Sequence, residues 1–237
     1  GRRVVLKSKY PVYLLDRPSL DKFLFDSAVK AGAKTRTGER FIGYRKLRNC
    51  LKVKTDKNTY KTKILVGADG ANSTVGKQAG LKYPEDYLVG VQTTATGEFN
   101  NVELWIGSKF CPKFFAWVVP ENSGVARIGL ATNPNASKYY EDFLKMRIGR
   151  VEKPNVGGII RFGLMENTSA DRVMVVGDAA CQVKPYSGGG IIYGLIGSKF
   201  AARSALDAIE YKKFDESFLK ESYDEKWKTI LGPAITR

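Results

Sequence analysis

Two segments of the chain combine a short apolar run, an Asp beside a Gly, and the start of a helical pattern. Asp69 and Gly70 follow the apolar run 64–68, and Asp178 follows the run 173–176. Apolar, β-branched runs of this length are typical of buried parallel strands, and open α/β sheets bind ligands outside the carboxyl ends of such strands. Both segments therefore predict a ligand site in which a carboxylate accepts hydrogen bonds, for example from sugar hydroxyl groups.

A glycine triplet follows the second of these segments. Gly188, Gly189 and Gly190 directly precede an apolar helical pattern that begins at Ile191. Without side chains the backbone can approach a ligand closely, and a helix N-terminus favours negative charge. The alternative is a Gly-rich surface turn with no ligand. The strand pattern before the triplet and the helix pattern after it favour an anion-binding helix start.

The cysteine and histidine content limits the possible chemistry. Cys50, Cys111 and Cys181 are scattered without CxxC spacing, and the chain has no His. This argues against a disulfide framework, a metal site and His-based catalysis within these residues. We expect a reducing compartment, the cytoplasm.

The net charge of +15 predicts an anionic partner. The Lys and Arg residues are spread along the chain, without an arginine-rich arm, a zinc finger or a helix-turn-helix pattern, so nucleic acid is not expected. A phospholipid substrate and peripheral contact with an anionic membrane surface fit the charge, and a lysine-rich surface without a partner is the alternative. No apolar run has the length of a membrane-spanning helix.

The hydropathy pattern predicts the mixed α/β class. A helix capped by Ser19 and ending at Gly32, a short helix after Ser73, a helix capped by Ser137 and two C-terminal helices over 191–209 and 214–231 are expected. Expected strands are 12–15, 41–44, 51–54, 60–66, 89–93, 102–106, 114–119, 125–130 and 173–176. The aromatic-rich strands between 88 and 162 indicate a separate antiparallel sheet, with a turn at 154–158.

Three segments resemble one known family. The stretches ILVGADGANSTVGKQAGL and VMVVGDAACQVKPYSGGGIIYG resemble interior motifs of the FAD-dependent family that includes aromatic hydroxylases and geranylgeranyl reductases. YLLDRPSLD resembles a third motif, with an Arg ahead of a helix, and PKFFAWVVP resembles a substrate-domain segment of the reductases. Hydroxylases of this family usually have His at the position of Cys181 and Gln inside the glycine triplet. This chain has neither, and its triplet is unbroken. The chain thus resembles the geranylgeranyl reductase family, of the digeranylgeranylglycerophospholipid type.

The resemblance implies a fold and a domain division. It implies an FAD-binding, Rossmann-like domain formed by residues 1–87 and 166–237, with an antiparallel substrate domain inserted at 88–165. Members of this family begin with a strand-GxGxxG-helix unit, and no such motif occurs here. We therefore expect a fragment that lacks the first βαβ unit and is inactive alone.

The resemblance also implies the site residues. FAD is the implied cofactor, and the implied cofactor-binding residues are Arg17, Asp69, Gly70, Asp178, Pro185, Gly188, Gly189, Gly190 and Ile191. The negative charge of reduced flavin would lie at the helix start, and Asp178 would bind the ribityl chain or lie beside the pyrophosphate. Phe115 and Trp117, with Phe114, would line a substrate cavity, although ordinary sheet packing also explains these aromatics. No proton donor is assigned, because a structural role explains Cys181 better than a catalytic one.

The implied reaction is saturation of isoprenoid double bonds in geranylgeranyl lipids, a step of archaeal membrane lipid biosynthesis. One alkene carbon would receive hydride from reduced FAD, and the other a proton. The electron donor, NAD(P)H or ferredoxin, is not indicated by the sequence. Two alternatives stay open: a flavin-dependent monooxygenase or halogenase of the same fold, and a non-catalytic basic module that docks on anionic surfaces.

Overall fold

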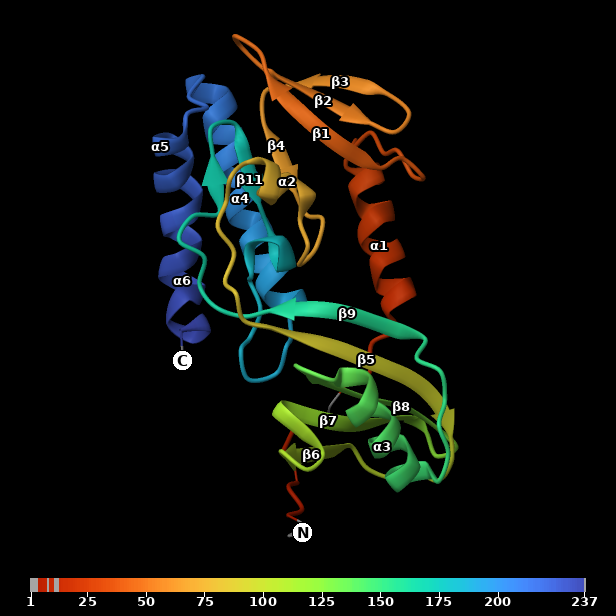
Figure 1. The fold of residues 1–237 in the computed structure, drawn as a ribbon. Coiled ribbons are helices and arrows are strands. Elements are labelled where there is room, and N and C mark those ends of the chain that lie inside the picture. Colours follow the sequence, from red (N-terminus) through yellow and green to blue (C-terminus); the bar gives the residue numbers. More distant parts are fainter. Residues whose placement is uncertain (1–3, 8, 11–12, 237) are drawn as a thin grey trace. The chain divides into compact units, whose positions relative to one another are not determined.

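A computed structural model describes residues 4–7, 9–10 and 13–236, and it divides into two units, 1–39 and 40–237 (Figure 1). The first unit contains helix α1 (Arg17–Lys30), whose N-cap is Asp16 rather than Ser19. The Asp16 carboxylate accepts a hydrogen bond from the Ser19 backbone N–H at 3.3 Å, and Pro18 suits a first helical turn, so the helix begins earlier than expected.

The strand expected at 12–15 in the first unit is also wrong. Residues 13–16 form no strand, and Val12 lies outside the described residues. No residue of α1 is buried, so its apolar side chains face no core formed within residues 1–39. This short segment has too little chain of its own to cover them.

The second unit starts with an antiparallel meander of β1 (Phe41–Lys46), β2 (Leu51–Thr55) and β3 (Thr59–Thr62). Leu51 and Val53 point from it into a core cluster shared with Val173 and Val175. The three predicted strands are confirmed, except that the run 60–66 divides. Its second half is β4 (Leu65–Gly67), which leaves the meander and joins another sheet.

That other sheet has the order β10 (Ser169–Ala170), β11 (Val173–Val175), β4. β11 runs parallel to β4, with Val175 opposite Gly67, and the Val176 N–H continues the ladder to the Gly67 carbonyl at 2.9 Å. The predicted parallel strand is therefore confirmed. Helix α2 (Thr74–Gln78), capped by Ser73 as expected, follows β4, and the 3₁₀ turn η1 (Gly177–Ala180) follows β11.

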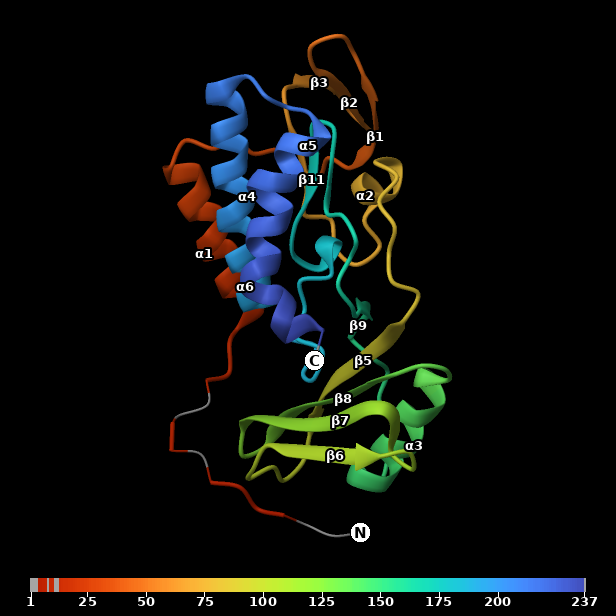
Figure 2. The ribbon, with the colours of Figure 1, turned by 90° about the vertical axis from the view of Figure 1, so that its left-hand side faces the viewer.

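An antiparallel five-stranded sheet forms the end of the unit opposite the meander (Figures 1 and 2). Its order is β6 (Glu103–Gly107), β7 (Cys111–Asn122), β8 (Val125–Thr132), β5 (Tyr87–Thr96) and β9 (Val156–Arg161). The four predicted strands are confirmed. The expected turn at 154–158 is wrong, because ladder pairing with β5 extends the Gly-containing segment into β9.

Helix α3 (Ala136–Ile148) covers one face of this sheet, where Tyr140, Phe143 and Leu144 join its core. Its N-cap is Asn135 in the left-handed conformation, with no side-chain cap, so the expected Ser137 cap is wrong. Asn tolerates that conformation better than most residues, which lets the helix begin two residues earlier than expected.

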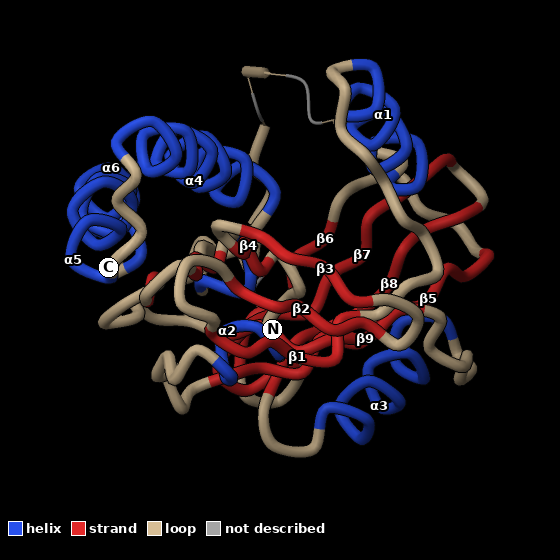
Figure 3. Tube along the Cα trace, turned by 90° about the horizontal axis from the view of Figure 1, so that it is seen from above, coloured by secondary structure: helices blue, strands red, loops and turns tan. Residues whose placement is uncertain are grey.

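The C-terminal helices pack together beside the strands (Figure 3). They are α4 (Ile191–Tyr211), α5 (Glu216–Leu219), the π-helical turn η2 (Lys220–Asp224) and α6 (Glu225–Ile235). The predicted single helix over 214–231 is thus interrupted by a wide turn. None of the helices in the described part of the chain is long and apolar enough to cross a bilayer.

The wide turn directs both Tyr223 and Asp224 inward, where they support β11 and the segment before it. The Tyr223 hydroxyl donates to the Val175 carbonyl at 2.5 Å, and burial raises its pKa. The Asp224 carboxylate accepts from the Thr168 N–H at 2.9 Å, and the Thr168 hydroxyl in turn accepts from the Trp227 indole N–H at 2.9 Å. These buried bonds fix the strand whose end carries the Asp178 turn.

Candidate functional site

The two Asp turns leave the same edge of one sheet, because β4 and β11 are parallel neighbours. The segment after α2 connects to the second turn, because the Tyr83 hydroxyl donates to the Ala179 carbonyl at 2.9 Å. A Cβ on Gly76 of α2 would overlap that hydroxyl, so α2 also packs against Tyr83. Segments separated by about a hundred residues of sequence therefore form one continuous edge.

The Asp69 carboxylate is bonded within its own turn. Its Oδ2 accepts from the backbone N–H groups of Thr74 at 2.7 Å and Val75 at 3.0 Å. Its Oδ1 accepts from the Ser73 hydroxyl at 2.5 Å, and that hydroxyl accepts from the Gly76 N–H at 2.9 Å. Asp69 and Ser73 together cap the start of α2. Gly70 has φ +78°, a left-handed conformation that turns the chain toward this cap.

The Asp178 turn is held by close backbone approach instead. Its carboxylate lies against Gly190, where an added Cβ would overlap Asp178 Oδ1. A Cβ on Gly194 of α4 would lie 3.4 Å from the Gly177 Cα, so the turn rests on the first turn of the helix. Glycine at these positions brings a carboxylate and a helix start together, and Asp178 stays exposed.

Gln182 supports this turn from inside. Its Oε1 accepts from the Gly177 N–H at 2.8 Å, and its Nε2 donates to the Tyr223 hydroxyl at 3.2 Å. Any side chain at Gly197 would overlap the Gln182 carboxamide. The turn is thus tied to both α4 and the buried C-terminal bonds, which makes it a rigid platform.

The start of α4 can accept an anionic group. The helix has 21 residues, begins at Ile191, and its N-cap Gly190 provides no side-chain acceptor for the first-turn N–H groups. Such a helix start carries partial positive charge. Gly189 is exposed, and Pro185 lies in the turn that leads to the triplet. The structure therefore brings the triplet and Asp178 together.

The triplet also meets the five-stranded sheet. Gly188 has φ +66°, and a Cβ there would lie 3.4 Å from Ile160 and 3.6 Å from the Phe114 ring. Phe114 stacks on Phe115 with ring centroids 4.2 Å apart, and Phe115 meets Trp117 edge-on at 6.0 Å. The predicted aromatic residues therefore continue from the glycine loop onto β7.

Trp117 lies on the face of the sheet away from α3. The ladder register places Leu104, Trp117, Gly129, Gln92 and Val156 in one row across all five strands. The indole ring passes over Gly129, where a Cβ would lie 2.7 Å from Cζ2, and its N–H donates to Gln92 Oε1 at 3.0 Å. Leu104 is 60% exposed and Val156 58% exposed, so this face presents apolar side chains outward.

Arg161 and Tyr83 were not predicted from the sequence, yet they join the parts of the site. Arg161, on β9, donates to the carbonyls of Ala71 at 3.1 Å and Pro84 at 3.0 Å, and its guanidinium lies 5.8 Å from the Tyr83 ring centroid. Burial raises the pKa of Tyr83, which keeps its hydroxyl a donor. Neither residue has a motif that marks it, because their partners are backbone atoms distant in sequence.

The structure does not test the predicted role of Arg17, and it gives Cys181 a buried position after the Asp178 turn. Arg17 belongs to the first unit, where its guanidinium lies 3.5 Å from Asp21, so its cofactor contact stays a prediction. Cys181 is buried in the left-handed conformation, and burial raises the pKa of its thiol to about 11. A thiol this weakly acidic is neutral near pH 7, which fits a structural role.

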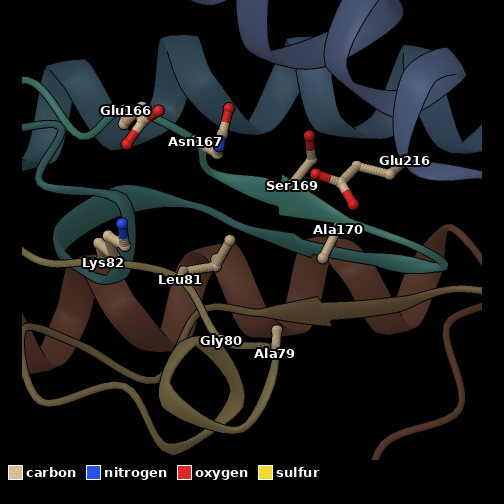
Figure 4. Close-up of a pocket in the computed structure, with 9 residues that line it drawn as sticks. All are labelled: Ala79, Gly80, Leu81, Lys82, Glu166, Asn167, Ser169, Ala170 and Glu216. Atoms are coloured by element: carbon tan, nitrogen blue, oxygen red, sulfur yellow. The ribbon is translucent and has the colours of Figure 1, made fainter.

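A polar hollow of about 280 Å³ lies elsewhere, between the end of α2 and β10 (Figure 4). Its lining consists of Ala79, Gly80, Leu81, Lys82, Glu166, Asn167, Ser169, Ala170 and Glu216. None of the predicted site residues lines it. The candidate site is therefore the edge formed by the two Asp turns, the start of α4 and β7.

Comparison with known proteins shows what the chain is similar to in sequence. No family model matches the chain. It is 30% identical to digeranylgeranylglycerophospholipid reductase of Methanosarcina mazei, over 94% of this chain and 60% of that protein. It is 31% identical to digeranylgeranylglycerophospholipid reductase 2 of Methanothermobacter thermautotrophicus, over 100% of this chain and 66% of that protein. The chain thus spans less than two thirds of the length of these relatives.

Solved structures share the fold. A geranylgeranyl bacteriochlorophyll reductase-like protein from Thermoplasma acidophilum superposes with a TM-score of 0.85 at 24% identity, over 97% of this chain and 64% of that one. A flavin-dependent halogenase superposes with a TM-score of 0.70 at 16% identity, over 92% of this chain and 44% of that one. The predicted fold class is confirmed.

Proposed function

Because the chain belongs by sequence to the family of the digeranylgeranylglycerophospholipid reductases, we propose that it works as an FAD-dependent reductase that saturates isoprenoid double bonds of geranylgeranyl glycerophospholipids. One observation carries the proposal furthest. The start of α4, whose N-cap Gly190 makes no side-chain cap bond, lies beside the apolar face of the five-stranded sheet, because a Cβ at Gly188 would lie 3.4 Å from Ile160 of β9. An anion-binding helix start beside an apolar face is what a flavin and a lipid chain together require.

The residues present fit FAD. The first-turn N–H groups of α4 at Ile191 would stabilise negative charge on the flavin ring, and Gly189 would allow the ring to lie close to the backbone. Asp178 is an exposed acceptor at the correct edge of the sheet for ribityl hydroxyls. Asp69 would act differently, by holding the α2 start in place through its three hydrogen bonds.

When bound, reduced flavin supplies hydride. This chain's own residues would position the substrate: Phe115, Trp117 and Leu104 offer an apolar face that an isoprenoid chain can cover. The Trp117–Gln92 bond fixes the indole ring flat on the sheet, so the face keeps its shape when the lipid leaves. Covering the face also excludes water, which protects hydride from competing reactions.

An isolated alkene offers no carbonyl for the protein to polarise, so a proton must reach the second carbon from a nearby acid. Cys181 is buried and Tyr83 half-buried, and burial raises the pKa of both groups. The Tyr83 hydroxyl is already bonded to the Ala179 carbonyl. Neither is assigned here as the donor. We place the lipid substrate at a membrane periphery, which agrees with the net charge of +15.

The test is an anaerobic assay of the purified full-length protein with dithionite-reduced FAD and an unsaturated archaeal-type glycerophospholipid. Mass spectrometry should find products heavier by one pair of hydrogens for each reduced bond. The same samples should bind FAD, as measured by the quenching of flavin fluorescence. A product heavier by one oxygen under air would instead indicate a monooxygenase of the same fold, and absence of flavin binding would contradict both.

A matched pair of variants sharpens the assay. Trp117→Ala removes the ring from the apolar face, whereas Trp105→Ala removes an indole from the opposite face, where Trp105 packs edge-on against Phe143 at 5.7 Å. Trp117→Ala should raise KM for the lipid and leave FAD binding unchanged. Equal effects of both variants on KM would assign the role of Trp117 to sheet stability alone.

A further inference from the structure

The positive charge of the chain is concentrated in one region, in contrast to the even spread expected above. Residues 40–68 hold nine Lys or Arg residues and a single acidic residue, Asp56. This segment, which forms the meander and β4, therefore carries more than half of the net charge of +15. The meander lies at the end of its unit opposite the five-stranded sheet (Figures 1 and 2).

The ladder register places the cations of the meander on one face. Arg45 is directly opposite Lys52, and Lys52 is directly opposite Lys61, so three cations form a row across the three strands. Lys54 lies two residues along β2 and therefore on the same face. The intervening Leu51 and Val53 point the other way, into the core. This face thus carries the row of cations beside Gly43 and Thr59, while Leu51 and Val53 face the core.

Such a row of cations lowers the stability of the fold when nothing neutralises it. Like charges directly opposite each other in a sheet are destabilising, and solvated sheet faces commonly alternate charges. Among the described residues, no ion pair joins Arg45, Lys52 or Lys54 to a carboxylate, whereas Lys46 on the same strand pairs with Asp171 at 3.0 Å. The row is better explained by an anion that neutralises it.

The same face is hollowed. A cavity of about 540 Å³ is lined by Arg45, Lys52 and Lys54 together with Ile42, Gly43, Tyr44, Thr59 and Gln78. Gln78, from α2, fixes one wall, because its carboxamide accepts from the Tyr44 N–H at 2.9 Å and donates to the Tyr44 carbonyl at 3.1 Å. No Asp or Glu lines this cavity. The lining of the hollow is therefore basic, and hydrogen bonds from Gln78 connect it to α2, the helix that Asp69 caps.

We propose that this hollow on the outer face of the meander binds the phosphate group of an anionic phosphate ester. Arg45 offers a planar fork of donors, Lys52 and Lys54 are point charges, and Thr59 adds a hydroxyl, a combination suited to phosphate oxygens. The volume exceeds that of a bare phosphate, and Ile42 offers an apolar contact for an organic part of the ligand. A soluble phosphate ester and a phospholipid head group share this chemistry.

The experiment compares two double variants that remove the same charge. Lys52→Gln with Lys54→Gln changes the hollow, and Lys220→Gln with Lys226→Gln changes two exposed lysines of the C-terminal helices. Calorimetric titration with glycerol 1-phosphate and with inorganic pyrophosphate, at saturating FAD, measures the soluble source. Co-sedimentation with phosphatidylglycerol vesicles, against phosphatidylcholine vesicles, measures the head-group source.

The meander variant should bind the phosphate probes about tenfold more weakly, because it loses two charge-assisted contacts, while the control variant binds as the unchanged protein does. Loss confined to the soluble probes identifies a soluble ester, and loss confined to vesicles identifies a head group. Equal weakening in both variants, or no saturable binding of any probe, overturns the proposal. FAD binding measured on the same samples reports separately on the proposed reductase function.

Discussion

The two Asp turns follow neighbouring parallel strands and have similar sequences, yet their carboxylates have different surroundings. Asp69 accepts three hydrogen bonds from residues 73–75 and is part of a helix cap. Asp178 is exposed and lies against the Gly190 backbone. The comparison teaches that a strand followed by Asp beside Gly indicates location at a sheet edge, whereas the next few residues decide whether the carboxylate is bonded within its own turn or left exposed.

Gly190→Ala tests the Asp178 side of this comparison, and its effect should be the largest. The added Cβ would overlap Asp178 Oδ1, so we expect a loss of about 1–3 kcal/mol in the free energy of unfolding. Urea denaturation measures it. Combining the change with Asp178→Ala should restore much of the loss, because the overlapping carboxylate is then gone. Strict additivity of the two changes would show that they do not touch.

Asp69→Ala and Asp178→Ala separate the two roles. Removing the Asp69 cap should cost about 1–2 kcal/mol of unfolding free energy, whereas removal of the exposed Asp178 carboxylate should change it by less than about 0.5 kcal/mol. FAD affinity, measured by fluorescence titration, should fall more for Asp178→Ala. The reverse order in both measurements would exchange the roles assigned to these residues.

Tyr83→Phe breaks the link between the turns without removing either. Loss of its hydrogen bond to the Ala179 carbonyl should destabilise the protein by about 1 kcal/mol in thermal or urea unfolding. Tyr211→Phe is the matched control, since Tyr211 is 58% exposed. If both variants unfold alike, the Tyr83 hydroxyl does not hold the turns together.

The smallest expected effect concerns cysteine reactivity. Cys111 and Cys181 are buried with pKa values raised to about 11, so at pH 8 almost all of each thiol is protonated and iodoacetamide should label neither in the folded protein. Half-buried Cys50 should be labelled first, as read by peptide mass spectrometry. Labelling of the other two should increase only as the pH rises toward 11. Early labelling of Cys181 would instead indicate an open turn.

Sequence patterns predicted the parts of the fold that depend on local periodicity. The meander, the parallel pair β4 and β11, and four strands of the five-stranded sheet follow from alternating or continuous apolar runs. β9 was missed because its two glycines suggest a turn, and pairing with β5 overrides that preference. The caps at Ser19 and Ser137 were wrong because Asp16 and Asn135 start their helices earlier.

Within the candidate site, glycines and carboxylates were identifiable because strand ends and helix starts have sequence signals. Two contacts could not be identified from the sequence: the packing of Asp178 on Gly190 and the link through Arg161 and Tyr83. Both join positions that only the folded chain brings together. The meander illustrates the same limit: its cations are visible in the sequence, but their alignment on one face requires the register of three strands.

The π-helical turn at Lys220–Asp224 fixes the number of residues between α5 and α6 as well as their types. One residue of an ordinary helix corresponds to a rotation of about 100°. Shortening the wide turn by one residue would rotate the Trp227 side of α6 away from Thr168 and toward solvent, while every local helical preference stayed satisfied. The number of residues in this turn therefore constrains the packing of α6 as strictly as the identity of its buried side chains does.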